Sequence, residues 1–289
     1  MDYVSPPEIL SEAINLARRK AGLSVMDLVV RGVLAGAFLG YATSLAMVIA
    51  AQGLPPIVGA IVFPVGFVML ALLGLELATG NFALLPVGVL SGDVSWGKLM
   101  RNWFWVYAGN LLGSILYAGL FYLAITNCGT SNGGALADQA RQLALKKTAG
   151  YAALGASGWA TAVVKGILCN WMVTLGAILA LASRSTVGKV VAMWLPILTF
   201  FALGYEHSIV NMYVIPAGMM LGAPISPAKW WIWNQLPVTL GNIISGAVFT
   251  GAALYVTYAG KPKPVATREA PASPALELAR PSQPEAVRA

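Results

Sequence analysis

One short stretch, LGYEHSIVNMYVIPAG at 203–218, carries the residues best suited to proton chemistry. His207 is the single histidine of the chain, and its neighbour Glu206 is the only acidic residue between Lys189 and Lys229. Histidine has an unperturbed pKa of about 6.5, so its ring exchanges a proton near neutral pH. A hydrogen-bonded core histidine is the ordinary alternative. An ionisable group within an apolar membrane segment favours a role in an ion or proton pathway instead.

Part of this pattern recurs earlier in the chain. GLELATGNFALLPVG from Gly74 aligns without a gap with GYEHSIVNMYVIPAG from Gly204, which pairs Glu76 with Glu206 and Asn81 with Asn211. We interpret the two carboxylates as braces that accept hydrogen bonds from backbone N–H groups freed where a helix breaks. The two asparagines are expected to serve the same loops. A proton relay through the carboxylates is the alternative.

The elements that carry these residues are apolar and long. The chain has 289 residues, 58% of them hydrophobic and only 10% charged, with a mean hydropathy of +0.73. A soluble domain carries about 25% charged residues, so this composition predicts an integral membrane protein. The net charge of +7 comes largely from basic residues in loops and tails, which indicates anchoring at a membrane surface and no nucleic-acid partner. The predicted spans are 28–51, 57–91, 103–125, 161–182, 190–221 and 234–258.

Two of these stretches, 57–91 and 190–221, are longer than the roughly 20 residues that one membrane helix needs. Each contains the polar cluster of the repeated motif. The sequence therefore predicts an all-α fold of six transmembrane spans, arranged as a 3+3 inverted repeat with broken second and fifth helices. The repeats cover about 28–126 and 160–258. Eight complete helices are the alternative.

The organisation around the spans is also predicted. Residues 1–27 are expected to form a cytoplasmic amphipathic helix, 28–258 the transmembrane channel domain, and 259–289 a disordered cytoplasmic tail rich in proline, alanine and charge. Basic residues concentrate on the side that holds both termini, which fits the positive-inside rule and a multi-pass protein of the cell (inner or plasma) membrane.

Five motifs spread over most of the spans resemble those of the formate/nitrite transporter family: ELATGN, NWFWVYAGNLLG, KGILCNW, YEHSIVNMYVIPAG and LPVTLGNIISG. The resemblance runs over about 6–258. It implies a homopentamer in which every protomer has its own aquaporin-like pore for a small monovalent anion such as formate, nitrite or hydrosulfide.

The resemblance also assigns roles to individual residues. His207 matches the central pore histidine of the family, Thr79 the loop threonine beside it, and Asn242 a pore asparagine. Leu77 and Phe200 match residues that narrow the pore, and Phe63 and Phe67 are expected to line the same constrictions. Without the resemblance, these four apolar residues would be expected only to pack within the protein or face lipid. Two residues, Lys147 and Lys165, are candidates for a vestibule lysine, although a solvated loop explains Lys147 equally well.

These observations predict a channel for small monovalent weak-acid anions, formate foremost, with proton involvement at His207. A nitrite or hydrosulfide channel of the same family, a strictly proton-coupled secondary transporter and a pore for neutral solutes are the alternatives. An enzyme is not expected, because the sequence has no metal-ligand cluster, no nucleophile beside a base and no phosphate loop. No cofactor or metal is expected. Cys128 and Cys169 lack metal spacing and are interpreted as packing residues.

Overall fold

The computed structural model describes residues 2–260, and the regular structure in this part of the chain is helical, with connecting loops and one isolated bridge between Tyr3 and Ser183. The predicted tail lies outside the described residues from position 261 onward. Four helices are long and apolar enough to cross a membrane. They are α2 (Val25–Ala51), α6 (Trp96–Ile125), α8 (Gly155–Leu179) with a 3-10 turn (Ala180–Ala182), and the continuous helical run from Pro227 to Tyr258.

The last of these helices is not uniform. It consists of α11 (Pro227–Trp230), a π-helical segment (Trp231–Gln235), α12 (Leu236–Ile244), a second π-helical segment (Ser245–Ala252) and α13 (Ala253–Tyr258). The third predicted span begins earlier than expected, since α6 starts at Trp96, where Ser95 accepts a hydrogen bond from the Lys98 backbone N–H.

The two over-long stretches are each divided by an extended segment. The first contains α3 (Pro56–Val62), α4 (Pro64–Leu72) and α5 (Ala78–Leu90), and the second contains α9 (Thr186–Ala202) and α10 (Ser208–Met220). The chain leaves α4 at Gly74 with φ +64° and leaves α9 at Gly204 with φ +66°, a backbone conformation that favours glycine. α5 and α10 have 13 residues each. At 1.5 Å per residue this is about 20 Å, well short of a hydrocarbon core of about 30 Å.

The backbone at the two breaks is nearly the same. Leu77, before α5, has φ −116° and ψ 119°, and His207, before α10, has φ −108° and ψ 120°. The duplicated sequence therefore folds into two local structures of one kind, each a short helix entered from an extended segment.

Small residues let the long helices pack closely in pairs, α2 with α6 and α8 with α12. A Cβ added at Gly109 of α6 would lie 2.7 Å from the Val29 carbonyl oxygen, and one at Gly241 of α12 would lie 2.2 Å from that of Val163. Both distances are far below van der Waals contact, so each pair requires glycine at its crossing.

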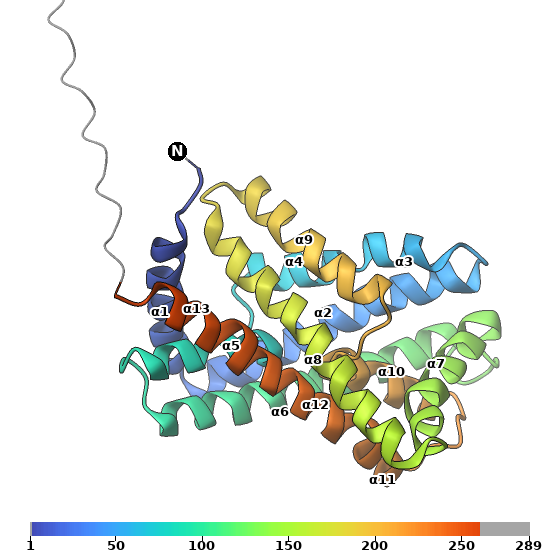
Figure 1. The fold of residues 1–289 in the computed structure, drawn as a ribbon. Coiled ribbons are helices and arrows are strands. Elements are labelled where there is room, and N and C mark those ends of the chain that lie inside the picture. Colours follow the sequence, from blue (N-terminus) through green and yellow to red (C-terminus); the bar gives the residue numbers. More distant parts are fainter. Residues whose placement is uncertain (1, 261–289) are drawn as a thin grey trace, which may run out of the picture.

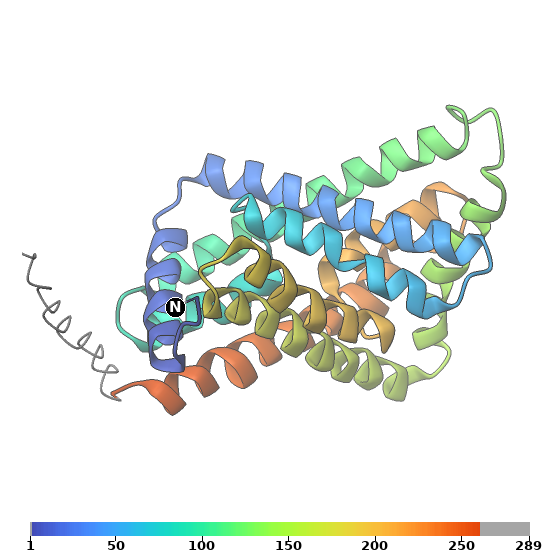
Figure 2. The ribbon, with the colours of Figure 1, turned by 90° about the horizontal axis from the view of Figure 1, so that it is seen from above.

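Two amphipathic helices lie at opposite ends of the bundle, α1 (Pro6–Ala21) at one end and α7 (Gly134–Ala152) at the other (Figures 1 and 2). α1 starts at Ser5, which donates hydrogen bonds from its N–H and its hydroxyl to Glu8, and ends with basic residues that suit the helix dipole. Ala17 of α1 packs on Gly88 of α5, and Ala144 of α7 packs on Gly218 of α10. The matching contacts thus extend beyond the predicted repeats to include α1 and α7.

Candidate pore and its two vestibules

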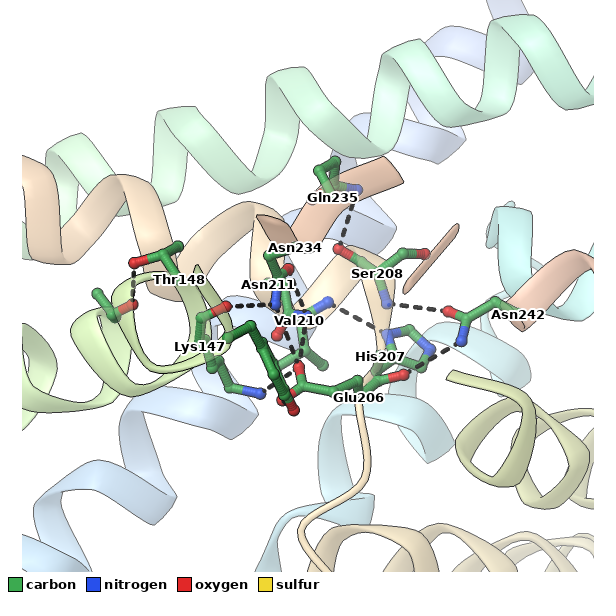
Figure 3. Close-up of polar contacts among 12 residues, drawn as sticks. Lys147, Thr148, Glu206, His207, Ser208, Val210, Asn211, Asn234, Gln235 and Asn242 are labelled. Atoms are coloured by element: carbon green, nitrogen blue, oxygen red, sulfur yellow. Dashed lines mark hydrogen bonds and ion pairs between the residues drawn. The ribbon is translucent and has the colours of Figure 1, made fainter. Parts of the chain in front are cut away.

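The two extended segments bring His207 and Thr79 together at the centre of the bundle. The Thr79 hydroxyl lies 3.0 Å from His207 Nε2, and the His207 side chain is buried, with a residue exposure of 2%. His207 Nδ1 accepts the Val210 backbone N–H at 3.1 Å (Figure 3). Because Nδ1 is an acceptor here, a neutral His207 carries its proton on Nε2 and donates it to the Thr79 oxygen.

Aromatic and aliphatic side chains surround this pair. The Phe200 ring stacks on the His207 ring with 5.8 Å between centroids and 20° between planes, and Phe63 contacts Phe200 edge-on at 5.8 Å. Leu77 and Phe67 are buried as well. The centre of the bundle is therefore a polar pair enclosed by apolar groups.

A cavity lies on each side of this centre. One, with a volume of about 480 Å³, is lined by Lys147, Lys165, Glu206, His207 and Phe200, and we name it the Lys147 vestibule. The other, with a volume of about 470 Å³, is lined by Lys20, Glu76, Asn81, Leu77 and Phe67, and we name it the Lys20 vestibule. Phe200 and His207 thus end one vestibule, and Leu77 and Phe67 end the other. Thr79 and Phe63 line neither cavity.

A network of four residues, joined by Tyr151 as a fifth, fixes the break in the second repeat, and we name it the bracing network (Figure 3). Lys147 Nζ lies 2.7 Å from Glu206 Oε2, and Asn211 donates to the same oxygen at 2.8 Å. Asn211 also donates to Asn234 Oδ1, and Asn234 donates to the Lys147 carbonyl oxygen at 2.9 Å. The Tyr151 hydroxyl donates to the other oxygen, Glu206 Oε1, at 2.9 Å.

The same network is present in the first repeat. Lys20 Nζ lies 2.7 Å from Glu76 Oε1, and Asn81 donates to Glu76 Oε2 at 2.8 Å. Asn81 donates to Asn102 Oδ1, and the Asn102 amide nitrogen donates to the Lys20 carbonyl oxygen at 3.1 Å. In this repeat no side chain takes the place of Tyr151 among the described hydrogen bonds of Glu76.

Asn242 and its counterpart Asn110 tie the short helices to the long ones. Asn242 accepts the Ser208 N–H at 2.9 Å and donates to the carbonyl oxygens of Gly166 and Glu206. Asn110 accepts the Ala78 N–H at 2.9 Å and donates to the carbonyl oxygens of Gly32 and Glu76. Each asparagine therefore satisfies a free N–H at the start of α10 or α5, and all its hydrogen-bonding atoms have partners in the loop or the adjacent helix.

The structure thus brings His207, Thr79 and Phe200 together, places Leu77 at the end of the Lys20 vestibule, and places Lys147 and Lys165 in the other vestibule. Sequence reasoning missed Lys20, Tyr151, Asn102 and Asn234. A signal for Lys20 is present in the sequence, since LARRKAG at 16–22 is similar to LALKKTAG at 143–150 and pairs Lys20 with Lys147.

These features define a class of protein: a multi-pass helical membrane protein in which a buried polar centre separates two basic vestibules, an arrangement suited to a channel or transporter. The comparisons identify which one. A family model described as "Formate/nitrite transporter" matches residues 7–256, and the chain belongs to this family. The predicted resemblance is therefore confirmed, and the family consists of membrane transporters and channels for anions.

Individual relatives and solved structures support the same family assignment. A "Probable formate transporter" of Methanothermobacter thermautotrophicus is 34% identical over 275 residues, which cover 89% of this chain and 97% of the relative. A solved structure described as "FNT family ion channel" matches with a TM-score of 0.75 at 29% identity, covering 86% of this chain and 98% of that one. Another, "Pentameric formate channel with formate bound", matches with a TM-score of 0.65 at 28% identity, covering 81% of this chain and 96% of that one.

Proposed function

We propose that this chain forms a channel for small monovalent weak-acid anions, with formate as the substrate, and that a proton is exchanged at His207. One observation carries the proposal: the only imidazole of the chain is paired with Thr79 between two separate vestibules that both contain lysine. Formate appears in the descriptions of relatives of this chain, including a solved structure with formate bound.

The apolar groups around His207 explain why a proton is needed. An ion loses most of its hydration in a dry, narrow passage lined by Phe200 and Leu77, and this costs far more for an anion than for its neutral acid. A weak acid can cross as the neutral form after taking up one proton. A strong-acid anion of similar size cannot, and is excluded.

The hydrogen bonds of His207 suggest how that proton is supplied. In the resting arrangement Nδ1 accepts the Val210 N–H, so the ring is neutral. An anion in the Lys147 vestibule favours the charged imidazolium, which requires Nδ1 to release Val210 and take up a proton from water. Transfer of the Nε2 proton to the anion yields the neutral acid. The Nδ1 proton then shifts to Nε2 by exchange with water, and the contact with Val210 is restored.

We further propose six spans as a 3+3 inverted repeat, since α5 and α10 are each too short for a complete span and each continues a preceding half-helix. Homopentameric assembly is supported by the solved relative described as pentameric. We also propose that the protein lies in the inner or plasma membrane with both termini in the cytoplasm, because more basic residues flank the spans on that side.

A strictly proton-coupled carrier is the second candidate, favoured by the burial of the whole His207–Thr79 centre. Purified protein in liposomes that contain a pH-sensitive dye separates the two. Under a formate gradient, a channel for the acid acidifies the lumen at a rate that reaches half-saturation only at millimolar formate or above, whereas a carrier reaches half-saturation at lower formate concentrations. A formate current without acidification would refute the proton step, and absence of any formate flux would refute the function. Nitrite and hydrosulfide in the same assay test the other substrates.

A further inference from the structure

The Lys147 vestibule contains a second buried interaction that the bracing network does not use. The Nζ of Lys165 lies over the ring of Tyr151, 5.9 Å from its centroid, within the usual range for a cation–π contact. Both residues line the cavity, and Tyr151 is buried. Among residues 2–260, no carboxylate lies within ion-pair distance of Lys165. Its charge therefore faces the cavity uncompensated.

Lys147, by contrast, already forms an ion pair. Its ammonium group lies 2.7 Å from Glu206, and the pair is almost completely buried, with side-chain exposures of 12% and 4%. An anion that approached Lys147 would also approach the Glu206 carboxylate, and the two charges largely cancel at the anion's position. Two cations that line this vestibule, Lys146 and Lys165, have no ion pair among the described residues, and of these Lys146 is exposed while Lys165 is partly buried.

The residues around Tyr151 hold its ring in place. Its hydroxyl is fixed to Glu206 Oε1, and the turn from α7 into α8 is tight: Gly155 has φ +57°, and a Cβ at Gly158 would lie 2.0 Å from the Tyr151 carbonyl oxygen. The Lys165 carbonyl oxygen accepts the Glu206 N–H at 3.3 Å. Tyr151 and Lys165 are thus both anchored to the loop that carries His207, and the ring keeps the long lysine side chain from extending out of the cavity.

The other vestibule provides an internal comparison. KGILCN, with Lys165, corresponds to RGVLAG, with Arg31, and Arg31 lines the Lys20 vestibule. Arg31 is ion-paired with Asp27 at 3.2 Å, one helical turn before it. Thr161 takes the equivalent place before Lys165, and its hydroxyl donates to a backbone carbonyl oxygen. Both copies of the repeat therefore place a cation at this position, but only Arg31, on the Lys20 side, is paired with a carboxylate.

We propose that Lys165, positioned by the ring of Tyr151, is the docking cation of the Lys147 vestibule for the small monovalent anion. This inference rests on the proposed function and adds to it a docking residue and a positioning residue. Docking at Lys165 raises the anion concentration in front of His207. Arg31, whose charge is matched by Asp27, contributes less on the opposite side.

The test measures initial rates of formate uptake against formate concentration, at fixed ionic strength, in right-side-out and inside-out membrane vesicles. Orientation is checked with a membrane-impermeant maleimide, because Cys128 is exposed in the loop that leads into α7 while Cys169 is buried. Lys165→Gln should raise the half-saturation concentration about three- to tenfold from the Lys147 side, the effect of losing one partly screened charge. The maximal rate from this side and the half-saturation concentration from the other side should both stay within about twofold. The maximal rate from the other side should fall, because detailed balance keeps the ratio of maximal rate to half-saturation concentration equal in the two directions.

Tyr151→Leu should reproduce the Lys165→Gln result, and combining the two should add nothing. Tyr151→Phe keeps the ring and Lys165→Arg keeps the charge, so both should retain the wild-type half-saturation concentration. Arg31→Gln is the matched control. It should raise the half-saturation concentration from the Lys20 side by less than Lys165→Gln raises it from the Lys147 side. If Tyr151→Leu does not assemble, Tyr151→Met replaces it.

Three results would overturn the inference. An unchanged half-saturation concentration in Lys165→Gln rules out docking at Lys165. A change in Lys165→Gln but not in Tyr151→Leu rules out positioning by the ring. An equal rise in the half-saturation concentration on both sides assigns the effect to the whole protein. Failure of the proposed function looks different, because the wild-type protein would then take up no formate.

Discussion

The two bracing networks predict unequal costs for equivalent substitutions. Lys20→Met and Lys147→Met each leave a buried carboxylate without its cation, a loss of about 3–5 kcal/mol when one partner of a buried pair is removed. After the change, Glu206 keeps hydrogen bonds from Asn211 and Tyr151, at 2.8 and 2.9 Å, whereas Glu76 keeps one side-chain bond, from Asn81 at 2.8 Å. A hydrogen bond to a charged group contributes about 1.5–3 kcal/mol. Lys20→Met should therefore be more destabilising than Lys147→Met by about that amount.

The free energy of unfolding can be measured by titrating the detergent-solubilised protein with a denaturing detergent and following tryptophan fluorescence, since the chain has nine tryptophans. Two controls isolate the cause. Adding Tyr151→Phe to Lys147→Met should remove the difference between the repeats, and adding Glu76→Gln to Lys20→Met should restore most of the lost stability, because no buried charge then remains. Equal losses for the two lysine variants, or a greater loss for Lys147→Met, would refute the reasoning.

Three further predictions concern the centre, the long helices and α1. His207→Phe should keep assembly, checked by gel filtration, but abolish the pH dependence of formate uptake in liposomes; a pH profile like that of the wild type would exclude a proton role. Asn242→Leu and Asn110→Leu should each cost about 2–4 kcal/mol, because three hydrogen bonds are lost and a helix N–H is left buried; a loss below 1 kcal/mol in the detergent titration, taken as roughly the value of one bond, would contradict this. The hydrogen bond from Arg18, with a second from Ser91, holds the pKa of Asp93 below its usual value, so this contact stabilises the docked α1 above the usual aspartate range and is lost as the pH falls through the lowered pKa. The hydrogen-exchange protection factors of α1, which remove the intrinsic pH dependence of amide exchange, should therefore fall on acidification in the wild type and be lower but less dependent on pH in Asp93→Asn.

The all-helical membrane fold and the two helix breaks could be predicted because they rest on local signals. Apolar length identifies the long helices, and the ungapped match between the segments at Gly74 and Gly204 identifies the two breaks. The contact between Thr79 and His207 was expected from family resemblance. Local sequence alone would not have supplied it, because the two residues are far apart in the chain and only the assembled repeats bring them together.

The bracing lysines were harder to find because the offset between the repeats changes along the chain. It is 130 residues for Glu76 and Glu206, but Lys20 and Lys147 differ by 127 and Asn110 and Asn242 by 132. Insertions in the connecting loops cause this drift, so an ungapped comparison finds only the central motif. Asn242 shows a second limit: the family resemblance assigns it to the pore, but only the structure shows that its side-chain hydrogen bonds all go to the start of α10 and the adjacent backbone.

The near-identical backbone at Leu77 and His207 has an evolutionary consequence. A molecule assembled from two identical half-length chains would place the same residue at both positions, giving two imidazoles facing each other or none. A single chain that contains both copies is free of that constraint, since each copy of the motif can mutate independently. The first copy can then carry an aliphatic side chain, Leu77, while the second carries a titratable one, His207. A single protonatable centre in a two-fold scaffold is thus an outcome that gene fusion makes available and that a symmetric ancestor could not reach.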